Sequence, residues 1–249
     1  MTPASDATAP LTFVFLHYWP GSGREWQAVV DGLHPDYPCL TPNLGGFGGA
    51  PLPVGGCSVQ DYANEIARFI ADHRLTRYAL VGHSMGGKIA LTLAAREPQG
   101  LVGLALLSPS PPQGEPMTQE EREKRLHNYG DPQAAAARIP DITGRPLPEN
   151  LRQQIIDDNV RSHVEAYSAW LLTGSREDIS AQLAHLHVPV TLLVGTKDAV
   201  LPPNMHQQKT LPWLPSGTPL HLLEGVGHLQ PLEAPEEVVQ LLRAWATML

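Results

Sequence analysis

The chain has little cysteine, a deficit of positive charge and no long apolar run. Only two of its 249 residues are cysteines, Cys39 and Cys57, so no disulfide framework can stabilise the fold. Acidic side chains outnumber Lys and Arg by 25 to 17, and the formal charge of -8 argues against nucleic acid as a partner. No stretch approaches the roughly eighteen successive apolar residues of a membrane span, so we expect no membrane partner.

The first ten residues also lack a targeting pattern. "MTPASDATAP" has no basic patch followed by an apolar stretch, and therefore does not resemble a secretory signal. We expect residues 1–10 to form a flexible tail. Together with the two thiols, which we expect to be reduced, this predicts a cytoplasmic protein.

Short apolar segments alternate along the chain with longer helical patterns. Several of the short segments are apolar at successive positions, which is typical of strands covered on both faces. The expected strands are 11–18, 37–44, 77–82, 101–108, 188–195 and 218–225, and the expected helices between and after them are 24–33, 58–73, 87–97 and 234–249. This order predicts an α/β fold with a mostly parallel sheet of about six strands and helices on both faces.

The alternation is interrupted once, between residues 111 and 180. This segment contains helical patterns such as "TQEEREKRLHNYG" and "SHVEAYSAWLLTG" but no convincing strand. We expect it to form a helical cap over one end of the sheet. Residues 11–110 and 181–249 then form the core.

A serine lies between glycines where the third expected strand ends and a helix begins. The pattern Gly82-x-Ser84-x-Gly86 is weak by itself, but this position between strand and helix is the one that a nucleophile elbow requires. Such a tight turn brings the strand and helix backbones close together, so its neighbours must be nearly free of side chains. The following helix also directs its positive end at the site, where it helps a developing oxyanion.

Two further residues complete a candidate catalytic set. Asp198 follows the fifth expected strand and His228 follows the sixth, at the same edge of the sheet as Ser84. Alone, such an aspartate is more often a turn or cap residue, and such a histidine is more often structural. The order serine, acid, histidine, with each residue at a strand end, favours nucleophilic catalysis instead.

These segments carry a family resemblance. "GHSMGG", "GTKDAVLP" and "GVGHLQPLEAPEEV" resemble the nucleophile, acid and histidine segments of the α/β-hydrolase superfamily, and "FLHYWPGSGREW" resembles its oxyanion loop. The similarity is to its serine esterase and cofactor-free haloperoxidase-like branch. It implies Ser84 as nucleophile, His228 as general base and then acid, and Asp198 as the residue that orients the imidazole. It also implies an oxyanion hole formed by the backbone N–H groups of Trp19 and Met85.

The chain departs from the family pattern in its first loop. Tyr18 stands where the family usually has the glycine of His-Gly-x-Pro, so the identity of the amide that faces the oxyanion stays open. Trp19 either lies over the pocket or packs under the cap. Members often have two more strands before the one expected at 11–18, and ten residues cannot supply them.

Other residues have competing interpretations. Tyr18, together with Tyr129, Tyr167 and Trp170 from the expected cap, is a candidate for the pocket wall, although core packing is the default interpretation of the last three. Glu233 is a competing acid that we expect to fix the last loop or helix start instead. We expect no metal site, because the pair of histidines in "HLH" (185–187) has no third ligand in sight.

The predicted function is hydrolysis of a small, mostly apolar carboxylic ester, thioester or lactone through an acyl-enzyme on Ser84. This is the activity of a carboxylesterase-like enzyme that uses no cofactor. Alternatives on the same fold are a cofactor-independent dioxygenase and a hydrolase of carbon–carbon bonds, and a further alternative is a non-catalytic ligand receptor. The acyl-chain size and the oligomeric state do not follow from the sequence.

Overall fold

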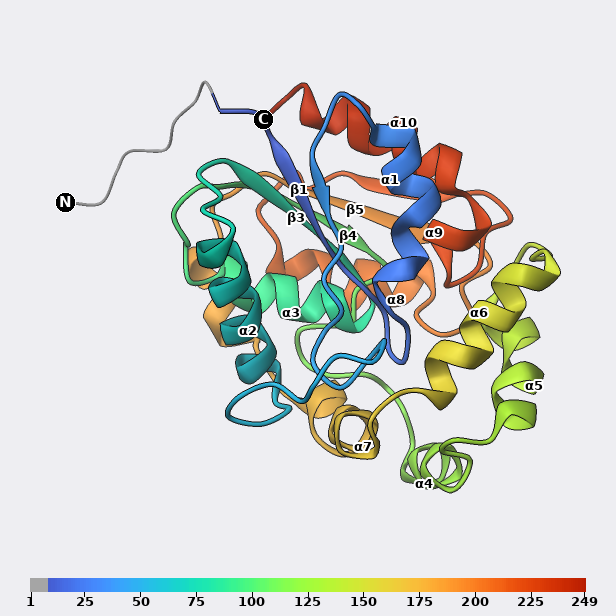
Figure 1. Cartoon of the computed structure of the whole chain (residues 1–249). Coiled ribbons are helices and arrows are strands. Elements are labelled where there is room, and N and C mark those ends of the chain that lie inside the picture. The colour runs from blue at the N-terminus through green and yellow to red at the C-terminus, as the bar shows by residue number, and fades with distance from the viewer. Residues whose placement is uncertain (1–8) are drawn as a thin grey trace.

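A computed structural model describes residues 9–249, and it contains a six-stranded parallel sheet with the strand order β2-β1-β3-β4-β5-β6 (Figure 1). The strands are β1 (Thr12–Leu16), β2 (Cys39–Leu40), β3 (Tyr78–His83), β4 (Leu101–Leu107), β5 (Val190–Gly195) and β6 (Leu220–Leu223). The predicted α/β class and the expected six strands are confirmed. The predicted tail at 1–10 lies almost entirely outside the described residues.

The second strand is much shorter than the segment 37–44 predicts. Only Cys39 and Leu40 pair with β1, opposite Phe13 and Val14. Proline lacks the backbone N–H that a sheet ladder needs, and the chain carries proline at 38 and 42, on either side of this pair. Because β2 lies at the edge of the sheet, this interruption leaves the central strands intact.

The two faces of the sheet are covered by different helices, and the side chains of β1 alternate between them. Phe13 and Phe15 pack in the cluster formed with α1 (Gln27–Leu33) and α10 (Pro235–Ala246). Val14 and Leu16 belong to the other cluster, formed with α2 (Val59–Asp72) and α3 (Met85–Ala94). All four side chains are fully buried, as the continuous apolar run in this strand predicts.

Local sequence signals set the ends of these helices. Ser58 precedes α2 and accepts a hydrogen bond from the Asp61 amide at 3.1 Å, and the Asp61 carboxylate accepts one from the Ser58 amide at 3.1 Å. This reciprocal capping satisfies two amides that the first helical turn leaves unpaired. Pro235 occupies the first turn of α10 together with Glu236 and Glu237, as the sequence predicts.

Four α-helices lie between β4 and β5, and we call them the helical insertion. They are α4 (Gln119–His127), α5 (Pro132–Ile142), α6 (Glu149–Val160) and α7 (Val164–Leu172). In Figure 1 they gather beyond the ends to which the strand arrows point. The buried Arg122 guanidinium contacts the Leu171 carbonyl and the Ser175 hydroxyl, and this ties α4 to the end of α7.

Short helices complete the structure. They are η1 (Gly23–Trp26), η2 (Gly174–Arg176), η3 (Ser180–His185), α8 (Pro203–Lys209), η4 (Leu211–Trp213) and α9 (Gln230–Glu233). Within residues 9–249, no helix has both the length and the apolar character needed to cross a bilayer.

Candidate active site

Ser84 occupies a strained turn between β3 and α3. Its backbone has φ 52° and ψ -113°, a combination that residues other than glycine rarely adopt. A Cβ atom on Gly82 would lie 2.6 Å from the Gly86 carbonyl oxygen, and one on Gly86 would collide with the Leu16 carbonyl. The glycines of this motif therefore allow the close approach of strand and helix that aims the serine side chain out of the turn.

The structure brings Ser84, His228 and Asp198 together. The distance from Ser84 Oγ to His228 Nε2 is 3.0 Å, and the distance from His228 Nδ1 to Asp198 Oδ2 is 2.8 Å. The other carboxylate oxygen of Asp198 accepts hydrogen bonds from the amides of Val200 and Leu201, at 2.9 and 2.8 Å. These two amides fix the carboxylate, which in turn fixes the imidazole relative to the serine.

All three side chains are shielded from solvent, with exposed fractions of 7% for Ser84, 4% for His228 and 2% for Asp198. Burial by itself lowers the pKa of His228, but the negative charge and hydrogen bond of Asp198 outweigh it and raise that pKa above its ordinary value. Burial likewise opposes ionisation of Asp198, and the facing His228 nevertheless holds the pKa of this carboxyl below its usual range. The pair thus favours a charged carboxylate that stabilises a protonated imidazole.

The backbone amides near Ser84 differ in whether they have a hydrogen-bond acceptor. The Tyr18 amide donates a hydrogen bond to Glu25 Oε1 at 3.2 Å, so it is occupied. In residues 9–249, no protein acceptor is found for the amide of Trp19 or for that of Met85, the first residue of α3. These are the two amides that the family resemblance assigns to an oxyanion hole.

His17 braces this loop. Its Nδ1 atom lies 2.8 Å from the Tyr18 carbonyl, and its Nε2 atom accepts a hydrogen bond from the Leu44 amide at 3.0 Å. Burial lowers the pKa of His17 to about 4. The imidazole is therefore neutral at pH 7, with its proton on Nδ1 donated to Tyr18.

Glu233 forms its hydrogen bonds with the backbone rather than with the imidazole of His228. One of its oxygens accepts hydrogen bonds from the amides of Gly144, Arg145 and Gly227 at 2.7, 2.8 and 2.9 Å, and the other accepts one from Leu229 at 3.0 Å. The amides of Gly227 and Leu229 flank His228, whereas those of Gly144 and Arg145 follow α5. The His228 amide itself donates to the Ile142 carbonyl at 2.9 Å, so the histidine loop and the helical insertion are joined.

A narrow cavity opens above Ser84 and His228, and about 570 Å³ of space, part of it open solvent, lies between its walls. The helical insertion supplies much of its wall, including Ala135, Arg138, Ile142, Ile155, Asn159 and Trp170. Of the expected pocket residues, Tyr18 and Trp170 line this cavity. Tyr167 lines an adjoining one, and Tyr129 lines neither; its hydroxyl donates to the Ser162 carbonyl at 2.6 Å.

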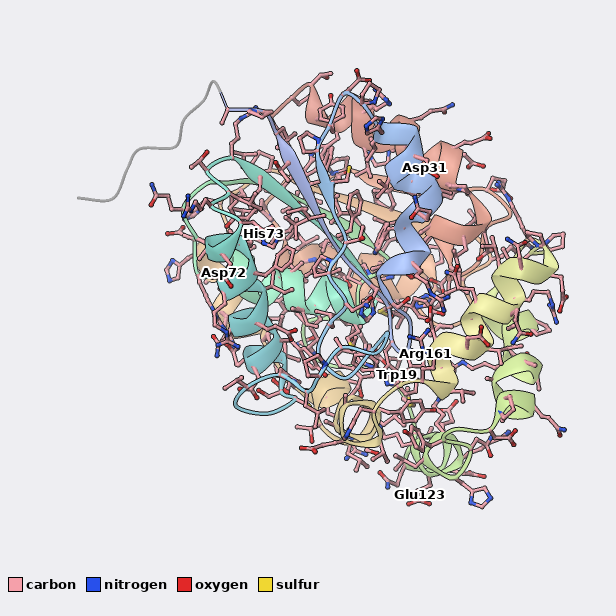
Figure 2. The ribbon with its side chains drawn as sticks, in the orientation of Figure 1. Trp19, Asp31, Asp72, His73, Glu123 and Arg161 are labelled. Carbon is pink, nitrogen blue, oxygen red and sulfur yellow. The ribbon has the colours of Figure 1, made fainter. Side chains whose placement is uncertain are left out.

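Trp19 both borders the cavity and packs against the helical insertion, so the structure agrees with both interpretations of this residue. Its side chain lines the cavity above Ser84, and its ring also packs against Tyr167 with a centroid distance of 4.6 Å. Figure 2 shows Trp19 on the side of the molecule where α6 and α7 lie.

Two charged residues of the cavity wall are absent from the sequence-based prediction. Glu115 lies in the loop that leads from β4 to α4, and Arg138 lies on α5; both line the cavity with Ser84 and His228. No motif marks either residue, because the sequence alone does not show how the insertion and the loop leading to it pack on the sheet. Within residues 9–249, no three His, Cys, Asp or Glu side chains form a group that could hold a metal ion.

Sequence comparison agrees with this geometry. A family model described as the alpha/beta hydrolase family matches residues 13–241. The chain belongs to the alpha/beta hydrolase family. The predicted family resemblance is therefore confirmed.

Relatives within this hydrolase family have several activities. The chain is 28% identical over 241 residues to a 2-succinyl-6-hydroxy-2,4-cyclohexadiene-1-carboxylate synthase of Serratia proteamaculans, covering 92% of this chain and 91% of the synthase. An esterase from Exiguobacterium antarcticum has a TM-score of 0.84 at 22% identity, and a bromoperoxidase from Bacillus anthracis has 0.81 at 19%. Each comparison covers 96% of this chain and 92% of the solved one. These two structures establish the fold of this hydrolase and leave its reaction open.

Proposed function

We propose that this alpha/beta hydrolase is a serine hydrolase that cleaves small carboxylic esters, thioesters or lactones. The observation that carries the proposal is the hydrogen-bonded row Ser84–His228–Asp198 beneath a cavity. A serine hydroxyl is a weak nucleophile until a neighbouring base takes its proton. Here the base is within hydrogen-bond reach, and a carboxylate holds its other nitrogen.

These contacts support the following reaction. Ser84 Oγ attacks the acyl carbon while its proton moves to His228 Nε2, and the carbonyl oxygen becomes an oxyanion. The amides of Trp19 and Met85 donate to this oxyanion. His228 then gives its proton to the leaving alcohol or thiol, which departs and leaves an ester on Ser84. Water attacks this ester with His228 as base, the acid is released, and the proton returns to Ser84.

The proposed substrate is small and mostly apolar over its acyl group. Ile142, Ile155, Met117 and Trp170 supply an apolar wall around the nucleophile. The helical insertion acts in this proposal as the cap that excludes water and sets the acyl-chain length.

A second candidate is supported by one observation, the presence of Arg138 in the cavity wall. The relative from Serratia is named for a product that bears carboxylates, and a guanidinium is well suited to a carboxylate. In this candidate His228 and Asp198 serve a synthase-type reaction on an anionic substrate. A comparison of p-nitrophenyl butyrate with its half-succinate analogue tests whether the cavity recognises an anionic substrate, because only the anionic ester should gain from Arg138 and lose that gain in Arg138→Gln.

The principal test uses p-nitrophenyl acetate and butyrate. Wild type should hydrolyse both, and Ser84→Ala should lose several orders of magnitude in kcat. A fluorophosphonate probe should label the wild-type serine and should not label the variant. Unchanged hydrolysis in Ser84→Ala contradicts the proposal. Oxygen consumption that survives this substitution indicates the dioxygenase alternative, and saturable ligand binding without labelling indicates a receptor.

A further inference from the structure

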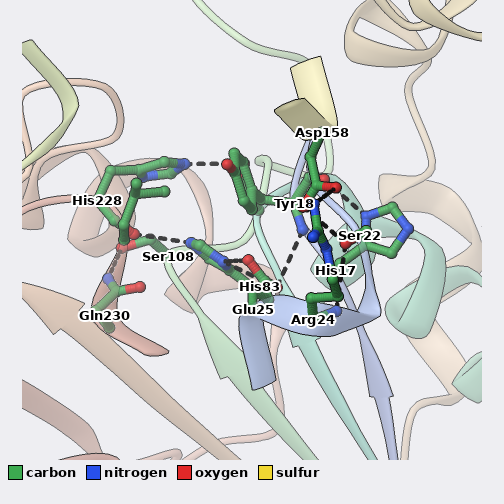
Figure 3. A network of polar contacts seen from close by, with 12 residues as sticks. His17, Tyr18, Ser22, Arg24, Glu25, His83, Ser108, Asp158, His228 and Gln230 are labelled. Carbon is green, nitrogen blue, oxygen red and sulfur yellow. Dashed lines mark hydrogen bonds and ion pairs between the residues drawn. The ribbon is translucent and has the colours of Figure 1, made fainter. Parts of the chain in front are cut away.

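A second buried chain of hydrogen bonds runs beside the candidate triad, through Glu25 and His83 (Figure 3). Glu25 lies in η1 and is 1% exposed, and His83 is the last residue of β3 and is fully buried. His83 Nδ1 lies 3.2 Å from Glu25 Oε2, and His83 Nε2 lies 2.8 Å from the backbone carbonyl of His228. The other Glu25 oxygen accepts the Tyr18 amide.

The protons in this chain follow from its contacts. A carbonyl oxygen can only accept, so His83 carries a proton on Nε2 and donates it to His228. Burial and the nearby His228 lower the pKa of His83, and burial raises the pKa of Glu25. Both shifts favour the neutral forms of these two groups. Since Oε1 already accepts from Tyr18, the carboxyl proton lies on Oε2 and is donated to His83 Nδ1.

We propose that Glu25 and His83 are positioning residues. They form a neutral carboxyl–imidazole relay that fixes the positions of the oxyanion loop and the His228 loop relative to Ser84. This inference rests on the proposed serine hydrolase function. Three segments far apart in sequence meet in the relay: the loop at Tyr18 and Trp19, the strand end that precedes Ser84, and the backbone of His228. A displacement of about 1 Å between such groups costs on the order of 100-fold in rate.

The packing around His83 holds the relay in one arrangement. The His83 ring lies 5.1 Å from the ring of His228, 5.4 Å from that of Tyr18 and 6.3 Å from that of Trp26. Beside it, the Ser22 hydroxyl donates to Asp158 of α6 at 2.7 Å, so the first loop is fixed on the insertion side as well. The relay is therefore packed among rings on one side, and the loop that carries it is hydrogen-bonded to the insertion on the other.

The test compares two variants that have nearly the shape of glutamate. Glu25→Gln keeps an acceptor for Tyr18 and a donor for His83, whereas Glu25→Met keeps the volume and removes both. We expect Glu25→Gln to retain kcat for p-nitrophenyl butyrate within about 5-fold, and Glu25→Met to lose about 10- to 100-fold in kcat with KM within about 3-fold. The control is Glu65→Met, which removes a half-buried carboxylate that accepts the Gly45 amide away from the site and should leave kcat unchanged.

A second substitution tests the same relay from its other end. His83→Phe retains an aromatic ring and removes the donor to His228, so it should lower kcat as Glu25→Met does. The double variant should lose little more than the stronger single variant, because both interrupt one chain. Equal kcat losses in Glu25→Gln and Glu25→Met indicate a charged pair and overturn the proposal, as does wild-type kcat in Glu25→Met or His83→Phe.

Nuclear magnetic resonance of 15N-labelled histidine provides a readout that does not depend on turnover or on the folding of variants. At about pH 7, wild-type His83 should be a neutral ring protonated at Nε2. A ring protonated at Nδ1 overturns the relay even if the enzyme is active. Failure of the fluorophosphonate to label the wild-type protein instead refutes the serine hydrolase proposal, and the His83 spectrum still decides the protonation of the relay.

Discussion

The Glu233 carboxylate offers a sharp test of how the histidine loop is held. It is 9% exposed and accepts four backbone amides, two of which flank His228. In Glu233→Gln one oxygen can still accept the amides of Gly144, Arg145 and Gly227, but the new NH₂ group faces the Leu229 amide. One charged hydrogen bond is then lost, and such bonds contribute about 1.5–3 kcal/mol each.

For a chain of this length, about 1 kcal/mol lowers Tm by roughly 2–4 °C. We therefore expect Glu233→Gln to lower Tm by about 3–12 °C in calorimetry, with a decrease in kcat of about 10-fold because the loop carries the proposed general base. The matched control is Glu237→Gln, which breaks a half-exposed ion pair with Arg145 of the same segment and should cost less than about 1 kcal/mol. A Glu233→Gln protein that melts within about 1 °C of wild type refutes this account of the loop.

Three other predictions address the site itself. In pH profiles, kcat/KM should rise as pH increases through the pKa of His228, which lies above the ordinary value of 6.5, because the neutral imidazole is the proposed base. Asp198→Asn should move this inflexion to lower pH and reduce kcat by about 10⁴-fold, and an unmoved inflexion contradicts the assignment. Gly86→Ala should lower the free energy of unfolding in urea by more than about 2 kcal/mol, because the new Cβ would collide with the Leu16 carbonyl. In the control Gly217→Ala the new Cβ meets nothing within 4 Å, so the stability loss should come only from the backbone strain of its positive φ. The free energy of unfolding should fall as pH decreases from about 6.5 to 4, since His17 is neutral in the fold with a pKa of about 4 and takes up a proton when the chain unfolds. A free energy of unfolding in urea that stays constant across this pH interval would count against the buried neutral ring.

The sequence predicts the sheet and the elbow well because short-range constraints determine them. Continuous apolar runs mark strands that are buried on both faces, and the glycines around Ser84 mark one turn that tolerates no side chain. Asp198 and His228 are also predictable, since both follow strands at one edge of a parallel sheet. The distances that join them to Ser84 are a property of the folded chain and come only from the structure.

What the sequence does not predict lies where distant segments meet. Glu115 and Arg138 enter the cavity only through the packing of the insertion on the sheet, and of two tyrosines in the insertion Tyr167 lines an adjoining cavity whereas Tyr129 lines neither. The relay through Glu25 and His83 is equally invisible, because 58 positions separate the two residues along the chain. Such contacts need the tertiary arrangement, and no local periodicity encodes them.

The hydrogen bond from the His228 amide to the Ile142 carbonyl restricts how the interior can be reached. If α5 swung outward as a rigid flap, it would drag the general base away from its serine. On the flank between α4 and α5, Arg125 and Arg138 border an adjoining cavity, which offers a route of entry that leaves this hydrogen bond in place. A different insertion on this scaffold would therefore need an acceptor in place of the Ile142 carbonyl before it could change the selectivity for substrates.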